Sequence, residues 1–380
     1  MTRAITMWDF SWLLRRFGSE AEYADVSRVL AELAERRYDV VRIDAFPQWI
    51  AADSTGAITQ EIHSVPQHET FMWGNHVPVT VRPREALVEF LHGLRERGLT
   101  AALSTWLTED ATGRSAAIRT PQDLARVWIE TLDFITAAGL LDVIEYVDLC
   151  NEWPLFVPSL HAAIWPTETD RGHGSGAVGW TDDDVQRVDT YNLALRAVKA
   201  AYPDLPVLFS YCLRGSRLPA ADDCMRIDTS DFDLAEVHLW LSSDEKFGTA
   251  TEFPVDYNGW ASLAAHQCGV EARYAGERDV WFRQLEELLD RWKAWADGRG
   301  LPIWTTECWA SVFWQPDLIE SPHWGTDWAY VKDVAEFAVP LAVARGWTGV
   351  ATSNFSQPHH AGMWADIGWH QRMNDLIHAG

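Results

Sequence analysis

The sequence predicts an α/β protein with a single (β/α)8 barrel domain that spans residues 1–380. Eight short runs rich in strand-forming residues alternate along the chain with amphipathic stretches long enough to be helices. Strict alternation of strands and helices is typical of a parallel sheet, and eight parallel strands close a barrel. No sequence repeat or low-complexity linker divides the chain, so we expect one domain.

The expected elements follow in a regular order. The predicted strands lie at residues 5–10, 40–45, 99–106, 143–150, 207–212, 234–241, 303–306 and 349–354. Amphipathic stretches between them lie at residues 23–37, 83–97, 121–138, 182–201, 279–296 and 328–344. Thr120 followed by Pro121 is typical of a helix start. Helix ends are indicated by Gly98, Gly139 and Gly346.

The predicted loops differ in length on the two faces of the barrel. Loops that lead from a helix into a strand are short, whereas those that leave a strand are long, notably 46–81, 151–181, 242–278 and 308–327. Active sites of such barrels lie on the strand-exit face. Long loops on that face therefore predict walls around one deep pocket.

Composition narrows the function classes. The formal charge of −24 argues against nucleic acid and anionic membranes as partners, because both require clustered Lys and Arg. No stretch reaches the roughly 20 apolar residues of a membrane span, and the amino terminus has no apolar signal core. Five cysteines, odd in number and without C-x-x-C spacing, indicate reduced thiols. We therefore expect a cytoplasmic protein.

Two glutamates carry the functional prediction. Glu152 and Glu307 each directly follow a predicted strand, and a parallel barrel brings such strand ends together. A retaining glycosidase uses one carboxylic acid to protonate the departing oxygen and one carboxylate to attack the anomeric carbon, with the carboxyl groups about 5–5.5 Å apart. The alternative is a pair of surface or salt-bridged glutamates.

The sequences around these glutamates resemble a known superfamily. Asn151-Glu152 at the end of strand four and Thr306-Glu307 at the end of strand seven resemble glycoside hydrolase clan A. The strings at residues 7–12 and 41–47 resemble family 5, subfamily 18. The resemblance implies that Glu152 is the acid/base, that Glu307 is the nucleophile and that Asn151 binds the hydroxyl beside the anomeric carbon. Subfamily 18 implies β-mannosides, including mannosyl-β-1,4-N-acetylglucosamine.

Two further positions match family 5 in part. Arg42 matches an arginine that lies beside the nucleophile and keeps it ionised; alternatively, it pairs inside the barrel with Asp44, Asp148 or Glu236. His238 matches the strand-six histidine of a His-x-Tyr string, but the third residue here is Trp240. Strand three also departs from the histidine-containing string of family 5 cellulases. These departures argue against ordinary cellulase activity.

The remaining candidate site residues would bind or stack on sugar. Asp9 and Asp44 end strands one and two and could bind hydroxyls. Tryptophan is abundant, with 22 copies, and sugar rings stack on aromatic faces. Trp364 is the main stacking candidate, and core packing is the alternative for every tryptophan. The others near strand ends are Trp49, Trp73, Trp106, Trp153, Trp165, Trp240, Trp309, Trp314 and Trp324.

These observations predict an exo-acting, retaining β-glycosidase that needs no metal or cofactor, with β-mannosidase action on short oligosaccharides as the leading activity. β-Glucosidase and β-N-acetylglucosaminidase activities on the same barrel are the nearest alternatives. Two alternatives from other functional classes are a metal-dependent sugar isomerase and a non-catalytic sugar-binding barrel. The adjacent pair His359 and His360 is a poor metal site, because neighbours on an extended chain point in opposite directions. The sequence predicts no oligomeric state.

Overall fold

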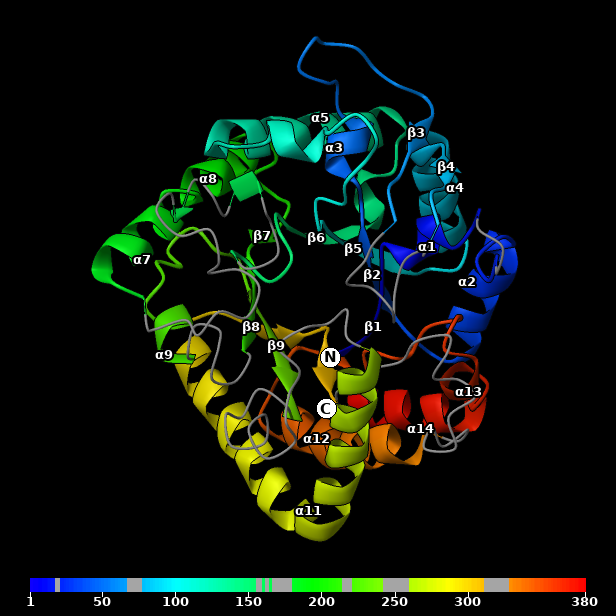
Figure 1. Cartoon of the computed structure of the whole chain (residues 1–380), viewed down its shortest axis with the longest axis vertical. Helices are drawn as coiled ribbons and strands as arrows, with labels where there is room; N and C mark the ends of the chain where they lie inside the picture. Colours follow the sequence, from blue (N-terminus) through cyan, green and yellow to red (C-terminus); the bar gives the residue numbers. More distant parts are fainter. Residues whose placement is uncertain are drawn as a thin grey trace.

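The computed structural model describes residues 1–17, 21–66, 77–154, 159–160, 164–165, 180–213, 221–241, 260–310 and 328–380. Parallel strands form a ring at the centre, and helices surround it (Figure 1). The predicted (β/α)8 barrel is therefore confirmed. In these residues no helix is both long and apolar enough to cross a membrane.

The strands follow the predicted order closely. Their bounds are β1 Arg3–Asp9, β2 Val40–Asp44, β5 Thr100–Ser104, β6 Ile144–Asp148, β7 Val207–Leu208, β8 Ser210–Leu213, β9 Ala235–Trp240, β10 Ile303–Thr305, β11 Cys308–Trp309 and β12 Gly349–Ala351. Parallel pairing runs from β1 through β2, β5 and β6 to β7, and from β8 through β9, β10 and β12 back to β1. Only Phe209 separates β7 from β8, so the chain itself closes the circle.

Three details differ from the prediction. The fifth strand is split around Phe209, because its first part pairs with β6 and its second part with β9. The seventh strand stops at Thr305 and resumes at Cys308, which leaves Glu307 in the break. The first long loop contains a small antiparallel hairpin of β3 (Ile62–His63) and β4 (Thr80–Val81).

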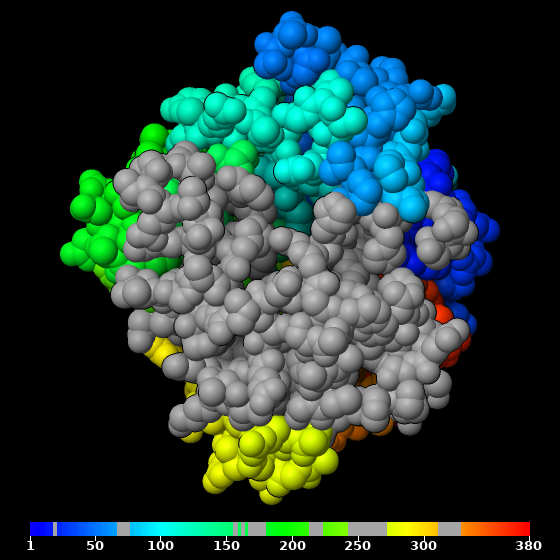
Figure 2. Space-filling view, in the orientation of Figure 1, coloured from blue at the N-terminus to red at the C-terminus, as the bar shows by residue number. Residues whose placement is uncertain are grey.

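Helices cover the outside of the ring. The longer ones are α2 Val26–Glu35, α4 Pro83–Arg95, α5 Pro121–Ala137, α7 Asp182–Asp189, α8 Asn192–Ala201, α11 Trp260–Asp297, α12 Ala329–Ala344 and α14 Ile367–His378. Short ones are α1 Ser11–Leu14, α3 Pro47–Ile50, α9 Ala221–Cys224 and α13 Ala361–Trp364. The space-filling view shows α11, in yellow, at the edge opposite residues 51–66 and α5 (Figure 2).

Local sequence signals explain several helix boundaries. Thr120 and Asp123 form a capping box at the start of α5: Thr120 Oγ1 accepts from the Asp123 N–H at 3.1 Å, and the Asp123 carboxylate accepts from the Thr120 N–H at 3.0 Å. Gly98, Gly139 and Gly346 have φ values of 67°, 70° and 74°. This left-handed conformation suits glycine and confirms the predicted helix ends.

Two predicted helices differ from the observed helices in their bounds and continuity. The stretch 182–201 forms two helices, α7 and α8, with a break at Thr190 and Tyr191. The stretch 279–296 is the second part of α11, whose backbone leaves helical geometry at Glu277, with φ −134° and ψ 25°. Neither difference moves a strand end, so the predicted site is unaffected.

The core has an apolar outer layer and a charged interior patch. Helix residues such as Val29, Leu30 and Leu33 of α2 are fully buried in the apolar core. The interior of a (β/α)8 barrel is normally filled by branched apolar side chains. Here Arg42 on β2 and Glu236 on β9 are also fully buried. Charged groups at these positions must be paired, because burying an unpaired charge is very unfavourable.

Candidate active site

Glu152 lies just beyond β6 in a backbone conformation that neighbouring strands hold in place. Its φ is 48°, in the left-handed region that non-glycine residues rarely adopt. The Glu152 N–H donates to Ser210 Oγ at 3.0 Å, and the Trp153 N–H donates to the Ser210 carbonyl at 2.8 Å. The Asn151 N–H donates to the Thr105 carbonyl at 2.9 Å. Three consecutive N–H groups therefore fix the direction of the Glu152 side chain.

Glu307 lies in the break between β10 and β11. Its carbonyl accepts from the Leu239 N–H at 3.1 Å, which keeps the chain beside β9 although regular pairing is interrupted. Both Glu307 and Glu152 are buried, with exposed fractions of 5% and 3%. The prediction that the barrel brings these two glutamates together at its strand-exit face agrees with this geometry.

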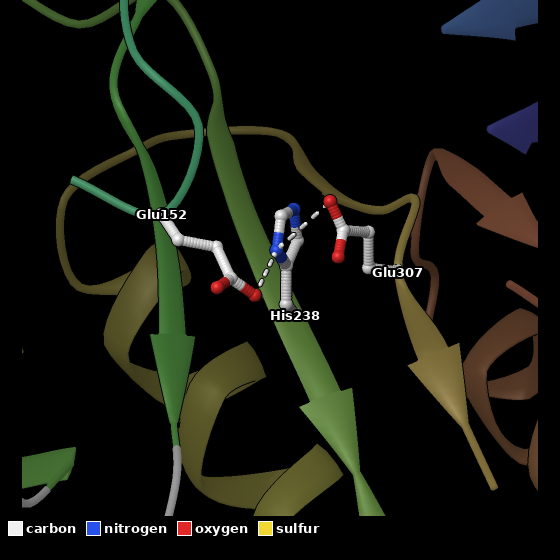
Figure 3. Close-up of side chains that lie close together, drawn as sticks. All are labelled: Glu152, His238 and Glu307. Carbon is white, nitrogen blue, oxygen red and sulfur yellow. Dashed lines mark hydrogen bonds and ion pairs between the residues drawn. The ribbon is translucent and has the colours of Figure 1, made fainter. Parts of the chain in front are cut away.

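His238 lies between the two carboxylates (Figure 3). Its Nδ1 is 2.9 Å from Glu152 Oε1 and 3.7 Å from Glu307 Oε1. One carboxylate oxygen of each glutamate and a ring nitrogen of His238 all lie within 4.8 Å of one another. This spacing is shorter than the about 6.5–9.5 Å that separates the carboxyl groups of an inverting glycosidase.

Arg42 links the site to the barrel interior. Its Nη1 is 3.1 Å from Glu307 Oε1, its Nη2 is 2.6 Å from Asp148 Oδ2, and its Nε is 2.9 Å from Glu236 Oε1. Nη2 also donates to Asn151 Oδ1 at 2.7 Å. Arg42 therefore contacts Glu307 and also pairs inside the barrel. Of the three suggested interior partners, Asp148 and Glu236 contact it.

The charges set the protonation of this cluster. The pKa of Glu307 is raised to about 7: burial raises it most, and Glu152 and Glu236 add to the rise, while His238 and Arg42 lower it. Arg42 therefore limits the rise in the pKa of Glu307 but does not cancel it, which corrects the expectation that Arg42 simply keeps this carboxylate ionised. Burial would lower the pKa of His238, but Glu307, Glu152 and Glu236 raise it to about 10.

Asp9 and Asp44 use their carboxylates within the protein. Asp9 accepts from the Ser11 N–H at 2.5 Å and from Gln357 Nε2 at 3.2 Å, and burial raises its pKa to about 8. Asp44 accepts from the N–H groups of Phe46 at 2.7 Å and Trp106 at 3.1 Å, and burial raises its pKa to about 7. Both carboxylates organise the loops after their strands, and their binding of sugar hydroxyls stays a prediction.

The structure separates the predicted stacking residues. Trp106 is half-buried, and its ring lies 5.0 Å from the guanidinium carbon of Arg42, at the site itself. Trp309 is fully buried and donates its Nε1–H to the Ala351 carbonyl at 3.0 Å. Trp240 is 6% exposed and contacts Phe355. Of these three, Trp106 is the tryptophan best placed to meet a sugar.

Trp364 requires a correction. It lies on α13, and its ring is 4.1 Å from the guanidinium carbon of Arg36 at the end of α2. Its Nε1–H donates to Glu32 Oε2 of α2 at 2.8 Å, and its ring meets Trp8 edge to face. The side chain packs in the layer between β1 and α2, so the predicted stacking role is not supported.

The remaining tryptophans divide between packing and undescribed positions. Trp153 stacks on Phe209, and Trp49 stacks on Phe46. Trp165 contacts Trp180. Trp73, Trp314 and Trp324 lie outside the described residues.

Sequence reasoning missed Ser210, and it named Asp148 and Glu236 only as interior partners of Arg42. Ser210 holds the Glu152 backbone, and its Oγ donates to Asp148 Oδ2 at 2.7 Å. Glu236 contacts both Arg42 and His238. One signal was available: Glu236 and His238 are two residues apart on a strand, so they lie on the same face. A charged residue beside a site residue in an otherwise apolar strand indicates an interior partner.

Comparison with known proteins identifies the family. Residues 5–378 match the family described as sugar-binding cellulase-like. A solved structure of a candidate glycoside hydrolase from Parabacteroides distasonis ATCC 8503 is 32% identical over 99% of this chain and 93% of that chain, with a TM-score of 0.84. The chain therefore belongs to the sugar-binding cellulase-like family, and its barrel is a cellulase-like glycoside hydrolase fold. This finding confirms the resemblance to clan A glycoside hydrolases.

A more distant structure shares the fold. Cellulose synthase subunit Z from Clostridioides difficile is 9% identical over 99% of each chain, with a TM-score of 0.53. A GH5_18 protein from Streptomyces cattleya, solved in complex with GlcNAc, is 15% identical over 100% of this chain and 80% of that chain, with a TM-score of 0.49. Such identities do not assign a subfamily, so subfamily 18 stays a prediction. No curated protein matches the chain.

Proposed function

We propose that the protein is a retaining exo-β-glycosidase that acts on short β-mannosides by double displacement. One observation carries the proposal: two buried glutamates at the strand-exit face have carboxylate oxygens within 4.8 Å of each other. Two carboxylates this close do not readily ionise together, so they share one proton. One acid and one carboxylate are what the first step of a retaining glycosidase requires.

The partners of the two glutamates favour different roles. Glu307 lies 3.1 Å from Arg42, whose permanent positive charge favours the carboxylate form, and Glu152 lies 2.9 Å from His238. In this proposal Glu152 therefore holds the shared proton. Glu307 attacks the anomeric carbon to form a glycosyl-enzyme as Glu152 protonates the leaving oxygen. Glu152 then takes a proton from water, which releases the sugar.

The proposed sugar specificity and exo action rest on the sequence resemblance and on Trp106. Residues 7–12 and 41–47 resemble the β-mannoside-acting subfamily, and Trp106 offers a half-exposed ring beside Arg42. The loops expected to close the pocket lie mainly outside the described residues, at 67–76, 155–158, 161–163, 166–179, 242–259 and 311–327. In this proposal the protein is cytoplasmic, so its substrate is an oligosaccharide small enough to be imported.

A substrate panel tests this specificity. We expect nitrophenyl β-mannoside and mannosyl-β-1,4-N-acetylglucosamine to be cleaved with higher kcat/KM than the matched β-glucosides and β-N-acetylglucosaminides. Groups placed for one epimer are left unpaired by the other, which costs about 1–3 kcal/mol for each buried group. Faster cleavage of cellobiose, or release of internal fragments from mannan, contradicts the proposed specificity.

The pH dependence of kcat/KM tests the state of Glu307. The nucleophile must be ionised, and its pKa is raised to about 7 from the ordinary 4.5 of a glutamate. Activity should therefore be lost as the pH falls through about 7, well above the range in which an ordinary glutamate would become protonated. The profile should be measured on an activated aryl glycoside, where proton donation limits the rate least. An acidic limb near 4.5 contradicts this prediction.

A metal-dependent sugar isomerase is the second candidate, because Glu152, His238 and Glu307 could together bind a metal ion. Carboxylate and imidazole groups are common ligands of divalent metals. However, the Arg42 guanidinium lies 3.1 Å from Glu307 and would repel a cation at that point. Glycosidase activity that survives EDTA treatment supports the hydrolase. Sugar isomerisation restored by added divalent metal supports the isomerase.

A further inference from the structure

Glu236 is a fully buried carboxylate outside the pair of catalytic glutamates. It lies on β9, two residues before His238, so both side chains point to the same face of the strand. Glu236 Oε1 is 3.3 Å from His238 Nε2 and 2.9 Å from Arg42 Nε, and it accepts a hydrogen bond from the Thr306 hydroxyl. It therefore contacts both positive groups that adjoin the catalytic pair.

The contacts of His238 Nε2 determine where its ring carries a proton. The Glu236 carboxylate can only accept a hydrogen bond. Thr306 Oγ1 also lies 3.3 Å from Nε2, and the Thr306 hydroxyl hydrogen is already donated to Glu236. Both neighbours of Nε2 are therefore acceptors. A bare Nε2 lone pair would face two oxygens, so the proton must be on Nε2.

We propose that Glu236 is a positioning residue that keeps a proton on His238 Nε2 and thereby reserves His238 Nδ1 for exchanging a proton with Glu152. The inference rests on the proposed function. Nδ1 and Glu152 Oε1 are 2.9 Å apart and share one proton. In one state Glu152 is a carboxylic acid that donates to neutral His238. In the other it is a carboxylate that accepts from the imidazolium.

The exchange needs no other reactant. Breaking the Glu152 O–H bond forms the His238 Nδ1–H bond, and the reverse step restores the acid. In the first state Glu152 is the acid that protonates the leaving group. In the second state Glu152 is a carboxylate, and His238 holds the proton so that it is not lost to solvent. Glu236 thus acts through His238 and does not touch the sugar, much as a buried carboxylate orients a catalytic histidine in other enzymes.

The electrostatic surroundings agree with this assignment. Charged groups face His238 from three elements in the described part of the chain: Glu236 from β9, Glu152 from beyond β6 and Glu307 from the break after β10. Arg42 from β2 pairs with Glu236 and with Glu307. Burial opposes ionisation of Glu236, but Arg42 and His238 lower its pKa to about 2, so it remains an acceptor over the working pH range.

Nitrogen NMR of the His238 ring tests the proposal without requiring turnover. In the wild-type protein we expect a proton on Nε2 at every pH at which the protein is folded. In Glu236→Gln we expect this preference to be lost, because an amide can also donate to Nε2. Asp148→Asn is the matched control: it removes another buried carboxylate that pairs with Arg42 but leaves the contact between Glu236 and His238 in place.

The pH profile of kcat/KM supplies a second readout. Removing a nearby negative charge lowers the pKa of proton-holding groups, and charges at this range shift a pKa by about 1–3 units. The basic limb of Glu236→Gln should therefore move down by about 1 pH unit. A bare Nε2 in the wild-type protein overturns the proposal even if Glu236→Gln does not fold. A folded Glu236→Gln variant whose His238 tautomer and pH profile are unchanged also overturns the proposal. Absence of glycosidase activity with Nε2 protonated would instead count against the proposed function alone.

Discussion

The Glu307→Ala variant should lose hydrolysis of every β-glycoside that the wild-type protein cleaves. No other described carboxylate adjoins Glu152 and His238 from the strand-exit side of the cluster, so the covalent intermediate cannot form. Removing the nucleophile of an enzyme that works through a covalent intermediate lowers kcat on the order of 10⁶-fold. The measurement is kcat on a nitrophenyl glycoside at a pH above 7, where wild-type Glu307 is ionised.

The control for this variant is a thermal melt that shows whether it is folded. In the folded protein the pKa of Glu307 is raised above its ordinary value, so ionisation of this group opposes folding as the pH rises from about 4.5 to about 7. The variant lacks that group and should melt no lower than the wild-type protein at pH above 7. Azide added to Glu307→Ala can attack the anomeric carbon from the vacated side and should give a glycosyl azide of inverted configuration.

The Glu152→Ala variant should show losses that depend on the leaving group. General acid catalysis contributes about 10²–10⁴-fold when the leaving group is a poor one, such as a sugar hydroxyl. Nitrophenolate leaves with little help, so formation of the glycosyl-enzyme from an aryl glycoside should be nearly intact. The second step still lacks its base and should become rate-limiting.

Azide separates the role of Glu152 from that of Glu307. It needs no deprotonation, so it should accelerate turnover of aryl glycosides by Glu152→Ala and give a glycosyl azide of retained configuration. His238 loses one partner in this variant but keeps Glu236. If the inverted azide came from Glu152→Ala and the retained azide from Glu307→Ala, the two roles would be exchanged.

Most of the fold was predictable because its signals are local. Capping by Thr120 and the left-handed glycines Gly98, Gly139 and Gly346 mark helix boundaries whatever the rest of the chain does. The split at Phe209 was not predictable, since it depends on the registers of two different neighbouring strands. The first part of α11 was not predicted, since residues 260–278 fell in the expected loop 242–278, although Gly276 is a sequence signal for the break at Glu277.

The site was predictable where position alone decides it. Glu152 and Glu307 follow strands, and parallel strands deliver their ends to one face. Sequence position does not decide the role of a polar residue that could serve either substrate or protein. Asp44 ends a strand just as Glu152 does, yet it accepts from the N–H two residues ahead, at Phe46. That local turn is a common alternative for aspartate and is disfavoured for the longer side chain of glutamate.

Aromatic residues were the hardest to assign. Trp106 ends one predicted strand and Trp364 follows another, but Trp106 lies over Arg42 and Trp364 packs against Arg36 on the outer layer. A tryptophan near a strand end can turn towards the barrel axis or towards the helices, and the sequence spacing alone does not determine which. Contacts from distant elements, such as Glu32 with Trp364, decide the direction.

Covalent trapping tests the central claim most directly. A fluorinated β-mannoside with an activated leaving group forms its glycosyl-enzyme quickly and hydrolyses it slowly, so the intermediate accumulates. Mass spectrometry of the digested protein should then find one sugar attached to Glu307, and Glu307→Ala should remain unlabelled. A label on Glu152, or active protein that is never labelled and releases product of inverted configuration, would contradict the account.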